Sequence, residues 1–386
     1  MVKKVCVFIG SRANYSSIRA ALKAIKQHEN LELQIVAGAS AVLDKFGAAV
    51  KLIEEDGFEI TRKSYMSIEG ETPATMAKST GLGLMDMSSI FEELHPNYVI
   101  VIGDRYEIIA PAIAAAYMNI PLVHTMGGEV TGTIDESIRH AVTKLAHIHF
   151  PANRESAERI RKLGEKPESI FTVGCPRIDM VKEIIENPYT DLKNLCGRFG
   201  GVGYEINFDE PFLLVSQHPV TTEYESVQKQ MVETLQAIEE LNMQTVMLWP
   251  NSDAGSDGIS REIRKYREAK PKNKIHLFKN LPMEVYITLM TKTACLIGNS
   301  SSGIREGEFI GTPCVNIGSR QAGRERGKNV IDVPNEHKKI VEAVMKQIDH
   351  GKYKSEHIYG NGNAGKQIAD ILANLEKIDV QKRITY

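Results

Sequence analysis

The residues best suited to chemistry form a serine-rich turn, Asn-Ser-Ser-Ser-Gly, at residues 299–303. A short apolar run at 294–298 predicts a buried strand before the turn, and an amphipathic segment at 304–310 predicts a helix after it. Hydroxyls and free backbone N–H groups at a helix N-terminus favour an anion such as a phosphate. Serine is also a common helix N-cap, so capping alone would explain the turn equally well.

Glu306 shifts the balance between these two explanations. It lies about one turn beyond the serine-rich turn, where a carboxylate does not help to hold an anion. It would suit ribose hydroxyls, as an acidic residue does in dinucleotide-binding folds. Donors for a phosphate, followed by an acceptor for a sugar, predict a nucleotide site.

Acidic residues follow two successive predicted strands earlier in the chain. Asp104 comes directly after an apolar strand, Glu129 follows the next one, and Asp135 and Glu136 lie where a helix is expected to begin. A doubly wound α/β sheet keeps its chemistry at the carboxyl ends of its strands. Asp104 and Asp135 could each simply cap a helix. Several acids that converge on one edge of a sheet nevertheless favour acid–base chemistry.

Basic groups also follow predicted strands. Arg12 and His218 each lie just past the end of a strand, where either could bind an anion. An exposed arginine in a turn is the alternative for Arg12. His147 and His149 alternate along a strand, but a zinc site requires further ligands than this pair offers, so we predict no metal.

The elements that must position these residues alternate between strands and helices. Strands are expected at 4–9, 31–37, 97–102, 121–125, 170–173, 212–216, 245–249, 275–278, 294–298 and 312–317. One helix is expected to end at residue 27. Further helices are expected at 47–56, 79–94, 108–118, 153–163, 177–186, 225–240, 259–269, 283–291 and 365–378. This rhythm is typical of parallel α/β units.

The chain is long enough for two domains, with 386 residues and 42.9 kDa. A polar, glycine-containing stretch at 188–210 fits a linker between lobes. We expect a first lobe at 1–187 that carries the carboxylates and a second at 188–364 that binds the nucleotide. A C-terminal helix within 365–386 is expected to cross back to the first lobe.

Composition narrows the class of ligand. The formal net charge of -2 gives no basic excess for nucleic acid or an anionic membrane, which leaves a small molecule as the expected partner. Five scattered cysteines without a C-x-x-C pair indicate reduced thiols. No apolar stretch approaches the length of a membrane span, and the N-terminal apolar run is too short for a signal peptide. We therefore expect a cytoplasmic protein.

Several segments make the chain resemble a known family. They read GSRANYS (10–16), IGDRYE (102–107), GGEVTGTIDESIRHAVTKLAHIHF (127–150), QHPVTTE (217–223), PNSDAGS (250–256), IGNSSSGIRE (297–306) and NIGSRQAGRERG (316–327). Two Rossmann-like α/β lobes with facing ligand loops resemble the GT-B fold. The sequence is similar to the hydrolysing UDP-N-acetylglucosamine 2-epimerases of bacterial sialic acid biosynthesis and to the epimerase domain of the bifunctional animal enzyme.

The resemblance implies that UDP lies in the second lobe. Ser300 and Ser301 would bind the diphosphate, Glu306 the ribose, and His218 the phosphate region. Asn251 would lie near the nucleotide. The remaining implied contacts come from the loop residues Arg12, Ser16, Arg105 and Arg320, which would close on the UDP.

The resemblance also implies the catalytic groups. Asp104 and Asp135 match two catalytic carboxylates of the family, whereas the third, a glutamate, falls on Met126. Either Glu129 or Glu136 takes its part, or the acid is dispensable with this substrate, or activity is low or altered. Asn14 stands where an acidic residue is common in the family.

The implied reaction converts UDP-N-acetylglucosamine and water to UDP and N-acetylmannosamine, with no metal, nicotinamide or other cofactor. C2 carries a hydrogen that no adjacent carbonyl acidifies, so the expected route expels UDP to give 2-acetamidoglucal and then adds water. Carboxylates would act as base and then as acid. The resemblance further implies a homodimer or homotetramer that serves the synthesis of sialic acid for a capsule or surface polysaccharide.

Four alternatives remain open at this point. The same hydrolysing reaction could act on a UDP-2,4-diacetamido-2,4,6-trideoxyhexose, as in legionaminic-type acid synthesis. A non-hydrolysing epimerase would instead return UDP-N-acetylmannosamine. A GT-B glycosyltransferase would need an acceptor and release no free acetamido sugar. A protein that binds the nucleotide sugar without turnover would bind UDP tightly and form no product.

Overall fold

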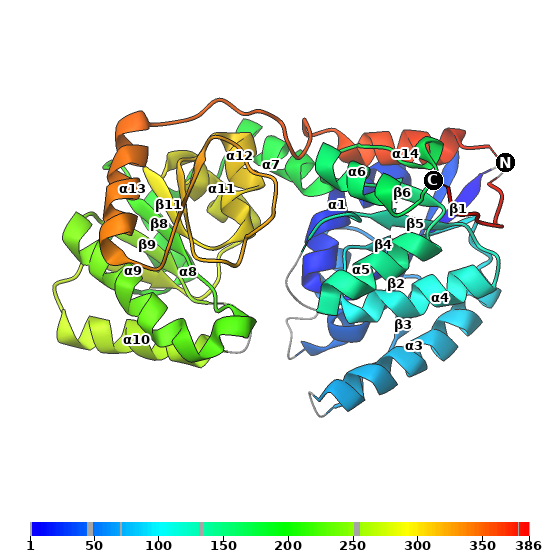
Figure 1. Ribbon diagram of the computed structural model, residues 1–386, viewed down its shortest axis with the longest axis horizontal. Coiled ribbons are helices and arrows are strands. Elements are labelled where there is room, and N and C mark those ends of the chain that lie inside the picture. Colours follow the sequence, from blue (N-terminus) through cyan, green and yellow to red (C-terminus); the bar gives the residue numbers. More distant parts are fainter. Residues whose placement is uncertain are drawn as a thin grey trace. The chain divides into compact units, whose positions relative to one another are not determined.

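The chain folds into two compact α/β units in the computed structural model (Figure 1), which describes residues 2–44, 49–69, 72–130, 134–250, 255–376 and 378–385. The first unit comprises Met1–Met180 together with Tyr359–Tyr386, and the second comprises Val181–Ile358. Each unit is built on its own largely parallel sheet, as the alternation of strands and helices predicts. Within the described residues, no helix combines the length and apolar character that a bilayer span requires.

The first unit is built on a parallel sheet with the strand order β3-β2-β1-β4-β5-β6. Its strands are β1 (Lys3–Ile9), β2 (Leu31–Gly38), β3 (Arg62–Ser64), β4 (Tyr98–Ile102), β5 (Leu122–Thr125) and β6 (Ile148–Phe150). β1 pairs in parallel with both β2 and β4, so the strand order reverses at β1. Such a reversal is where open α/β sheets bind ligands, at the carboxyl ends of the strands. The loops after β1 and β4 begin side by side at this point.

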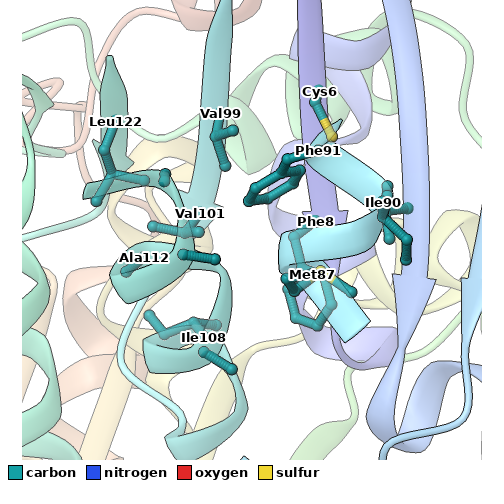
Figure 2. Close-up of a cluster of buried hydrophobic side chains, with 14 of the residues drawn as sticks. Cys6, Phe8, Met87, Ile90, Phe91, Val99, Val101, Ile108, Ala112 and Leu122 are labelled. Atoms are coloured by element: carbon teal, nitrogen blue, oxygen red, sulfur yellow. The ribbon is translucent and has the colours of Figure 1, made fainter. Parts of the chain in front are cut away.

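Apolar side chains from helices fill the space against this sheet. The helices are α1 (Arg12–Gln27), α2 (Ala49–Glu55), α3 (Pro73–Leu94), α4 (Ile109–Tyr117), α5 (Ile134–Leu145), α6 (Arg154–Lys162) and α14 (Ala364–Asn374). Figure 2 shows Met87 and Phe91 of α3 lying against Cys6 and Phe8 of β1 in one buried cluster. These side chains are at most 1% exposed, so they fix α3 on the sheet by burial of apolar surface.

The C-terminal segment is part of the first unit. α14 packs against α1 so closely that a Cβ at Gly365 would lie 2.6 Å from the backbone of Ala20. The Asp179 carboxylate accepts hydrogen bonds from the N–H groups of Ala364 and Gly365 at 2.9 and 2.7 Å, which satisfies the free donors at the start of α14. The helix ends at Asn374 rather than at the expected residue 378, because Leu375 is extended.

The chain beyond α14 reaches the end of α5. The Lys382 ammonium group donates to the carbonyl oxygens of Lys144 and Ala146 and forms an ion pair of 2.7 Å with Glu165. A cation at a helix C-terminus interacts favourably with the helix dipole. The C-terminal segment therefore fixes the far end of the helix whose first turn carries Asp135 and Glu136.

The second unit is built on a sheet with the order β13-β12-β11-β8-β9-β10-β7, parallel except for β7. Its strands are β7 (Val202–Gly203), β8 (Leu213–Ser216), β9 (Thr245–Leu248), β10 (Ile275–Phe278), β11 (Cys295–Gly298), β12 (Cys314–Ile317) and β13 (Val330–Val333). Its helices are α8 (Leu195–Phe199), α9 (Val227–Leu241), α10 (Ser256–Ala269), α11 (Met283–Lys292), α12 (Glu306–Ile310) and α13 (His337–His350), and α7 (Pro176–Glu186) enters it from the first unit. β8 lies between β9 and β11, with Ser216 aligned with Gly298. The strand order reverses here as well, so the loops after β8 and β11 start together.

The stretch at 188–210 is not the linker that its polarity suggested. Leu192, Leu195 and Ile206 from this stretch are buried in the second core, and β7 extends the second sheet. Leu192 lies in a short 3₁₀ helix and Leu195 is the first residue of α8, so local helical structure turns these apolar side chains to the core. Polar composition alone therefore misled the prediction.

The strand expected at 170–173 is also absent from the described structure. Ile170 makes only an isolated bridge to His149, and the chain then turns away from the sheet. The N–H of Phe171 donates to the carbonyl of His149 in β6 at 2.9 Å, whereas the N–H of Cys175 donates to the carbonyl of Tyr359 in the C-terminal segment at 2.8 Å. Pairing with β6 is therefore limited to this single contact.

Candidate functional site

Arg139 connects three segments at the carboxyl edge of the first sheet. It lies in α5 and is 1% exposed. Its guanidinium forms an ion pair with Asp104 after β4 and bonds Glu136 Oε2 at 3.1 Å. It also donates to the carbonyl oxygen of Glu129 after β5 at 2.8 Å. The structure therefore brings together three of the four predicted catalytic carboxyl residues around one buried cation.

Asp135 is the fourth predicted acid and lies in the first turn of α5. The pKa of Arg105 is raised mainly by the charge of Glu107 and to a smaller extent by that of Asp135, which places Asp135 in the neighbourhood of the loop after β4. Glu136, its neighbour, bonds His140 Nε2 through Oε1 at 3.0 Å. Both oxygens of Glu136 are therefore engaged within α5, one by Arg139 and one by His140.

Glu107 is a buried acid that the sequence did not single out. Its carboxylate is 1% exposed and accepts a hydrogen bond of 2.8 Å from Arg105 Nε. Burial raises its pKa, and the nearby guanidinium acts in the opposite direction. A Cβ at Gly10 would lie 2.6 Å from Glu107 Cγ, so a glycine after β1 makes room for this acid. Glu107 in turn holds Arg105 at the site.

His124 holds the loop after β4 through a hydrogen bond to its backbone. It is fully buried in β5, and its Nε2 bonds the carbonyl oxygen of Gly103 at 2.8 Å. Its Nδ1 lies 3.1 Å from the hydroxyl of Thr143 in α5. Burial lowers the pKa of His124 to about 3, so the imidazole is neutral at physiological pH. A neutral imidazole can donate at one nitrogen and accept at the other, as this arrangement requires.

The loop after β1 is tied to β4 through Asn14. Its Nδ2 donates to the carbonyl oxygen of Ile102 at 3.3 Å, and its Oδ1 accepts from the N–H of Gly10 at 3.2 Å. A carboxylate could not make the first of these bonds. Arg12 begins α1 and is exposed, and Ser16 lies half-buried one turn further on.

Met126 occupies the position where the resemblance predicts a third acid. It is 7% exposed and adopts a left-handed conformation with φ of 60°, which is uncommon for a residue other than glycine. Its N–H donates to the carbonyl of Phe150 at 2.9 Å. A thioether transfers no proton, so another group must perform any acid–base step at this position.

In the second unit, Asn299 joins the loop after β11 to the loop after β8 by two hydrogen bonds. Its Oδ1 accepts from the N–H of His218 at 2.7 Å, and its Nδ2 donates to the carbonyl of His218 at 2.8 Å. His218 Nε2 also lies 3.3 Å from the hydroxyl of Ser216. The imidazole is therefore fixed at the strand ends beside the serine-rich turn.

The serine-rich turn differs from its prediction. Ser300 caps a short 3₁₀ turn at Ser301–Gly303, and α12 begins only at Glu306. Glu306 thus lies in the first turn of a short helix rather than a turn beyond the start of a longer one, and it is 3% exposed. Ser300 and Ser301 are both half-buried at the surface of this turn.

Arg320 reaches the same loop from the end of β12. Its Nη1 donates to the carbonyl oxygen of Asn299 at 3.3 Å, and Gln321 Nε2 donates to that oxygen at 2.8 Å. His218, Ser300 and Arg320 therefore gather around Asn299 at the carboxyl edge of the second sheet. Asn251 lies outside the described residues.

Comparison with known proteins identifies the family. The family profile described as UDP-N-acetylglucosamine 2-epimerase matches residues 23–373 of the chain. The chain belongs to the UDP-N-acetylglucosamine 2-epimerase family. It is therefore an enzyme of this family.

Curated relatives of this 2-epimerase chain include two at 34% identity. One is the UDP-N,N'-diacetylbacillosamine 2-epimerase (hydrolyzing) of Legionella pneumophila, over 97% of this chain and 97% of the relative. The other is the GDP/UDP-N,N'-diacetylbacillosamine 2-epimerase (hydrolyzing) of Campylobacter jejuni, over 86% of this chain and 84% of the relative. The UDP-N-acetylglucosamine 2-epimerase of Neisseria meningitidis is 28% identical over 99% and 98% of the two chains.

Solved structures support the fold of the epimerase. The UDP-GlcNAc 2-epimerase from Neisseria meningitidis bound to UDP-GlcNAc matches with a TM-score of 0.78 at 16% identity, covering 96% of this chain and 99% of the other. The enzyme from Methanocaldococcus jannaschii in complex with UDP-GlcNAc and UDP matches with a TM-score of 0.75 at 17% identity, over 96% and 99%. The fold of the chain is thus GT-B, with two Rossmann-like units, which confirms the prediction.

Three supporting residues of the epimerase escaped the sequence analysis. Arg139 lies three residues after Glu136, a spacing that places the two on one helix face, and this was the available signal. Glu107 lies in the segment that carries Asp104 and Arg105, but nothing in the sequence shows that it is buried. Tyr286 of α11, whose phenol oxygen lies 2.7 Å from Ser302 Oγ in the serine-rich turn, had no signal of its own in the sequence.

Proposed function

We propose that the chain is a hydrolysing 2-epimerase that converts a UDP-linked 2-acetamido sugar and water to UDP and the free sugar inverted at C2. UDP-N,N'-diacetylbacillosamine, a 2,4-diacetamido sugar, is the proposed first substrate. The observation that carries this proposal is the similarity over 97% of both chains to a relative named as a hydrolysing epimerase of that substrate.

The chemistry proceeds by elimination. A base removes the hydrogen at C2 while UDP leaves from C1, so the C1–O bond breaks, a C1–C2 double bond forms and positive charge develops at C1. Water then adds to C1 of the glycal, and C2 receives a proton on the opposite face. No free carbanion forms at the unactivated C2, because the electron pair of the C–H bond forms the C1–C2 double bond as the C1–O bond breaks. Carboxylates can serve as base and then as acid.

Asp104 and Asp135 are the proposed proton-transfer groups. Asp104 is oriented by Arg139, and the loop that carries it is supported by His124. Asp135 comes from a different element, the first turn of α5. Two carboxylates delivered by separate elements can approach a sugar ring from different sides, which inversion at C2 requires.

Glu129 is the proposed replacement for the acid that Met126 lacks. The alternative, Glu136, has both oxygens engaged by Arg139 and His140. A carboxylate with both oxygens committed to neighbours must break a bond before it can accept or deliver a proton. Glu129 follows β5, is 6% exposed and is held at the strand edge beside Asp104 by the bond from Arg139 to its backbone carbonyl.

The second unit is proposed to hold UDP. Ser300, Ser301 and His218 would bind the diphosphate, and Glu306 the ribose. The remaining proposed UDP contacts are Arg12, Ser16, Arg105, Asn251 and Arg320. Donors fixed before the reaction stabilise the charge that develops on the leaving diphosphate. Loss of one such donor is expected to cost about 3 kcal/mol of transition-state stabilisation, as for an oxyanion-hole group.

UDP-N-acetylglucosamine is a second candidate substrate, with N-acetylmannosamine as its product. It is supported by the Neisseria meningitidis relative, and the polysialic acid biosynthesis protein P7 of Escherichia coli is 31% identical over 89% of this chain. The two candidates differ at sugar C4 and C6. A role in the synthesis of a sialic-type acid for a surface polysaccharide suits either substrate.

One product analysis tests the proposal. The purified chain is incubated with each UDP-sugar, and NMR follows the release of free UDP and of the free C2-inverted sugar. We expect both products, with higher kcat/KM for the diacetamido sugar, and their loss in Asp104→Asn. A nucleotide-linked epimer would instead indicate the non-hydrolysing reaction, and a requirement for an acceptor would indicate a glycosyltransferase. Tight UDP binding with no product over hours would contradict an enzymatic role.

A further inference from the structure

A row of hydroxyl groups connects α11 to the serine-rich turn. The phenol oxygen of Tyr286 lies 2.7 Å from Ser302 Oγ, which lies 2.9 Å from Ser300 Oγ. The three residues come from α11 and the loop after β11. Ser302 is 5% exposed. Water is therefore largely excluded from the middle of the row, and the hydroxyls must satisfy one another.

The phenol end of the row remains protonated. Burial raises the pKa of Tyr286 to about 12, and hydrogen bonding to Ser302 and Ser216 acts in the opposite direction. Ser216 also lies 3.3 Å from His218 Nε2. Tyr286 is thus placed between two of the groups proposed to bind the diphosphate, His218 and Ser300.

The direction of the hydrogen bonds follows from the chemistry of the groups. A phenol is a stronger donor than an aliphatic hydroxyl, because its proton is far more acidic. The two distances are compatible with either direction, and this order of acidity favours donation from Tyr286 to Ser302 and from Ser302 to Ser300. The backbone N–H of Ser302 donates to Ser300 Oγ as well, at 3.3 Å.

In this arrangement the hydroxyl group of Ser300 can make a further hydrogen bond only as a donor. A serine hydroxyl has two acceptor lone pairs and one hydrogen, and the two donations from Ser302 occupy the lone pairs. No residue in the described part of the chain accepts the remaining hydrogen. A hydroxyl in this condition favours a ligand atom that can only accept, such as a phosphoryl oxygen.

We propose that Tyr286 is a positioning residue that fixes the hydroxyl of Ser300 as a hydrogen-bond donor to a diphosphate. The proposal rests on the proposed function, because it assumes that UDP binds at the serine-rich turn. Tyr286 would act through Ser302 and Ser300 rather than by touching the reacting atoms. It would raise the affinity for phosphate groups and leave recognition of the nucleoside unchanged.

Two substitutions separate this role from a purely structural one. Tyr286→Phe keeps the ring and removes only the hydroxyl, and Ser300→Ala removes the proposed donor. We expect each to weaken UDP binding about tenfold in calorimetry, while uridine binding stays as in the wild type. The double variant should bind UDP no more weakly than Ser300→Ala alone, because the role proposed for the phenol is exerted through that serine.

Tyr353→Phe is the matched control. It removes the same kind of hydroxyl from the same unit, where Tyr353 donates to Gln347 Oε1 at 2.7 Å, and it should leave UDP binding unchanged. Thermal unfolding of all variants checks that each is folded. Wild-type affinity in Tyr286→Phe, an equal loss for uridine, or independent losses in the double variant would each overturn the proposal.

The outcomes also separate this inference from the proposed function. If the wild type binds UDP and turns over a UDP-sugar but Tyr286→Phe binds UDP equally well, only the role of Tyr286 is wrong. If the wild type does not bind UDP, the proposed function fails and this inference fails with it.

Discussion

The buried guanidinium group of Arg139 forms an ion pair with the carboxylate of Asp104, which is 25% exposed and lies 35 positions earlier in the chain. The pair joins α5 to the loop after β4, and the same arginine bonds the backbone after β5. One cation thus sets the relative positions of two loops and the helix α5, all of which carry proposed catalytic acids. The contribution of Arg139 to activity should be measurable separately from that of the catalytic acids.

Arg139→Gln is expected to lower both activity and stability. Removal of one partner from a fully buried ion pair typically costs about 3–5 kcal/mol, and because Asp104 is 25% exposed we expect a smaller loss of about 1–3 kcal/mol. We expect kcat/KM to fall about 100-fold, because misplacement of Asp104 affects the transition state. Steady-state kinetics and urea unfolding measure the two effects.

Arg161→Gln provides the control for that variant. Arg161 pairs with Glu158 at 2.7 Å in α6, but both side chains are about half exposed, at 55% and 43%. Exposed pairs contribute about 0–1 kcal/mol, so this variant should behave like the wild type. Equal losses in the two variants would show that the position of Arg139 has no special role.

Glu129→Gln is expected to reduce kcat far more than Glu136→Gln. Glu136 has both oxygens engaged by Arg139 and His140, and a glutamine there keeps one acceptor and gains a donor. If Glu129 performs the proton transfer that Met126 cannot, its amide removes the transferable proton altogether. We expect a loss of about 100-fold or more for Glu129→Gln and about tenfold for Glu136→Gln, by the usual size of general acid–base effects. The reverse order in steady-state kinetics would assign the step to Glu136.

The sequence predicted which candidate residues directly follow the ends of strands. Parallel sheets gather the carboxyl ends of their strands at one edge, so strand ends at Ile102 and Thr125 sufficed to bring Asp104 and Glu129 near each other. The family resemblance implied that His218 and Ser300 both contact the phosphates, and the structure aligns the strands before them at Ser216 and Gly298.

The sequence was less informative where orientation or burial decides the outcome. The bond between Arg139 and Asp104 depends on which face α5 turns to the sheet, and one sequence carries no direct signal of that. The start of α3 at Pro73 rather than 79 follows from a capping box between Thr72 and Thr75, which is a local signal that the apolar pattern hid. The linker prediction failed because burial of Leu195 depends on the tertiary fold.

Asn14→Asp is expected to destabilise the chain even though the family resemblance implies an acidic residue at this position. Asn14 donates to the carbonyl of Ile102, and a carboxylate there would face that oxygen without a hydrogen. Loss of the bond and the unsatisfied buried carbonyl should cost about 1–3 kcal/mol in free energy of unfolding. Urea unfolding at pH 7.5 measures this cost. Asn30→Asp, on the exposed turn before β2, should have a much smaller effect, and similar losses would contradict the role assigned to Asn14.

The free energy of unfolding is expected to depend on pH through His124. Burial lowers the pKa of this imidazole to about 3 in the folded chain, against a value near 6.5 in the unfolded chain. Below about pH 6.5 the unfolded state therefore binds a proton that the folded state does not. The resulting stability is fully present above that pH and is lost as the pH falls toward 3, by up to about 1.4 kcal/mol per pH unit.

His124→Gln should make stability less dependent on pH over this window. Glutamine can still donate to the carbonyl of Gly103, but it does not titrate, so the difference in unfolding free energy between wild type and variant should shrink as the pH falls from 7.5 to 4.5. Urea unfolding across that range measures the difference. His95→Asn removes an exposed histidine of the same unit and keeps a residue that tolerates the left-handed conformation at the end of α3. A constant difference for His124→Gln, or an equal change for His95→Asn, would show that His124 does not stay neutral in the folded chain.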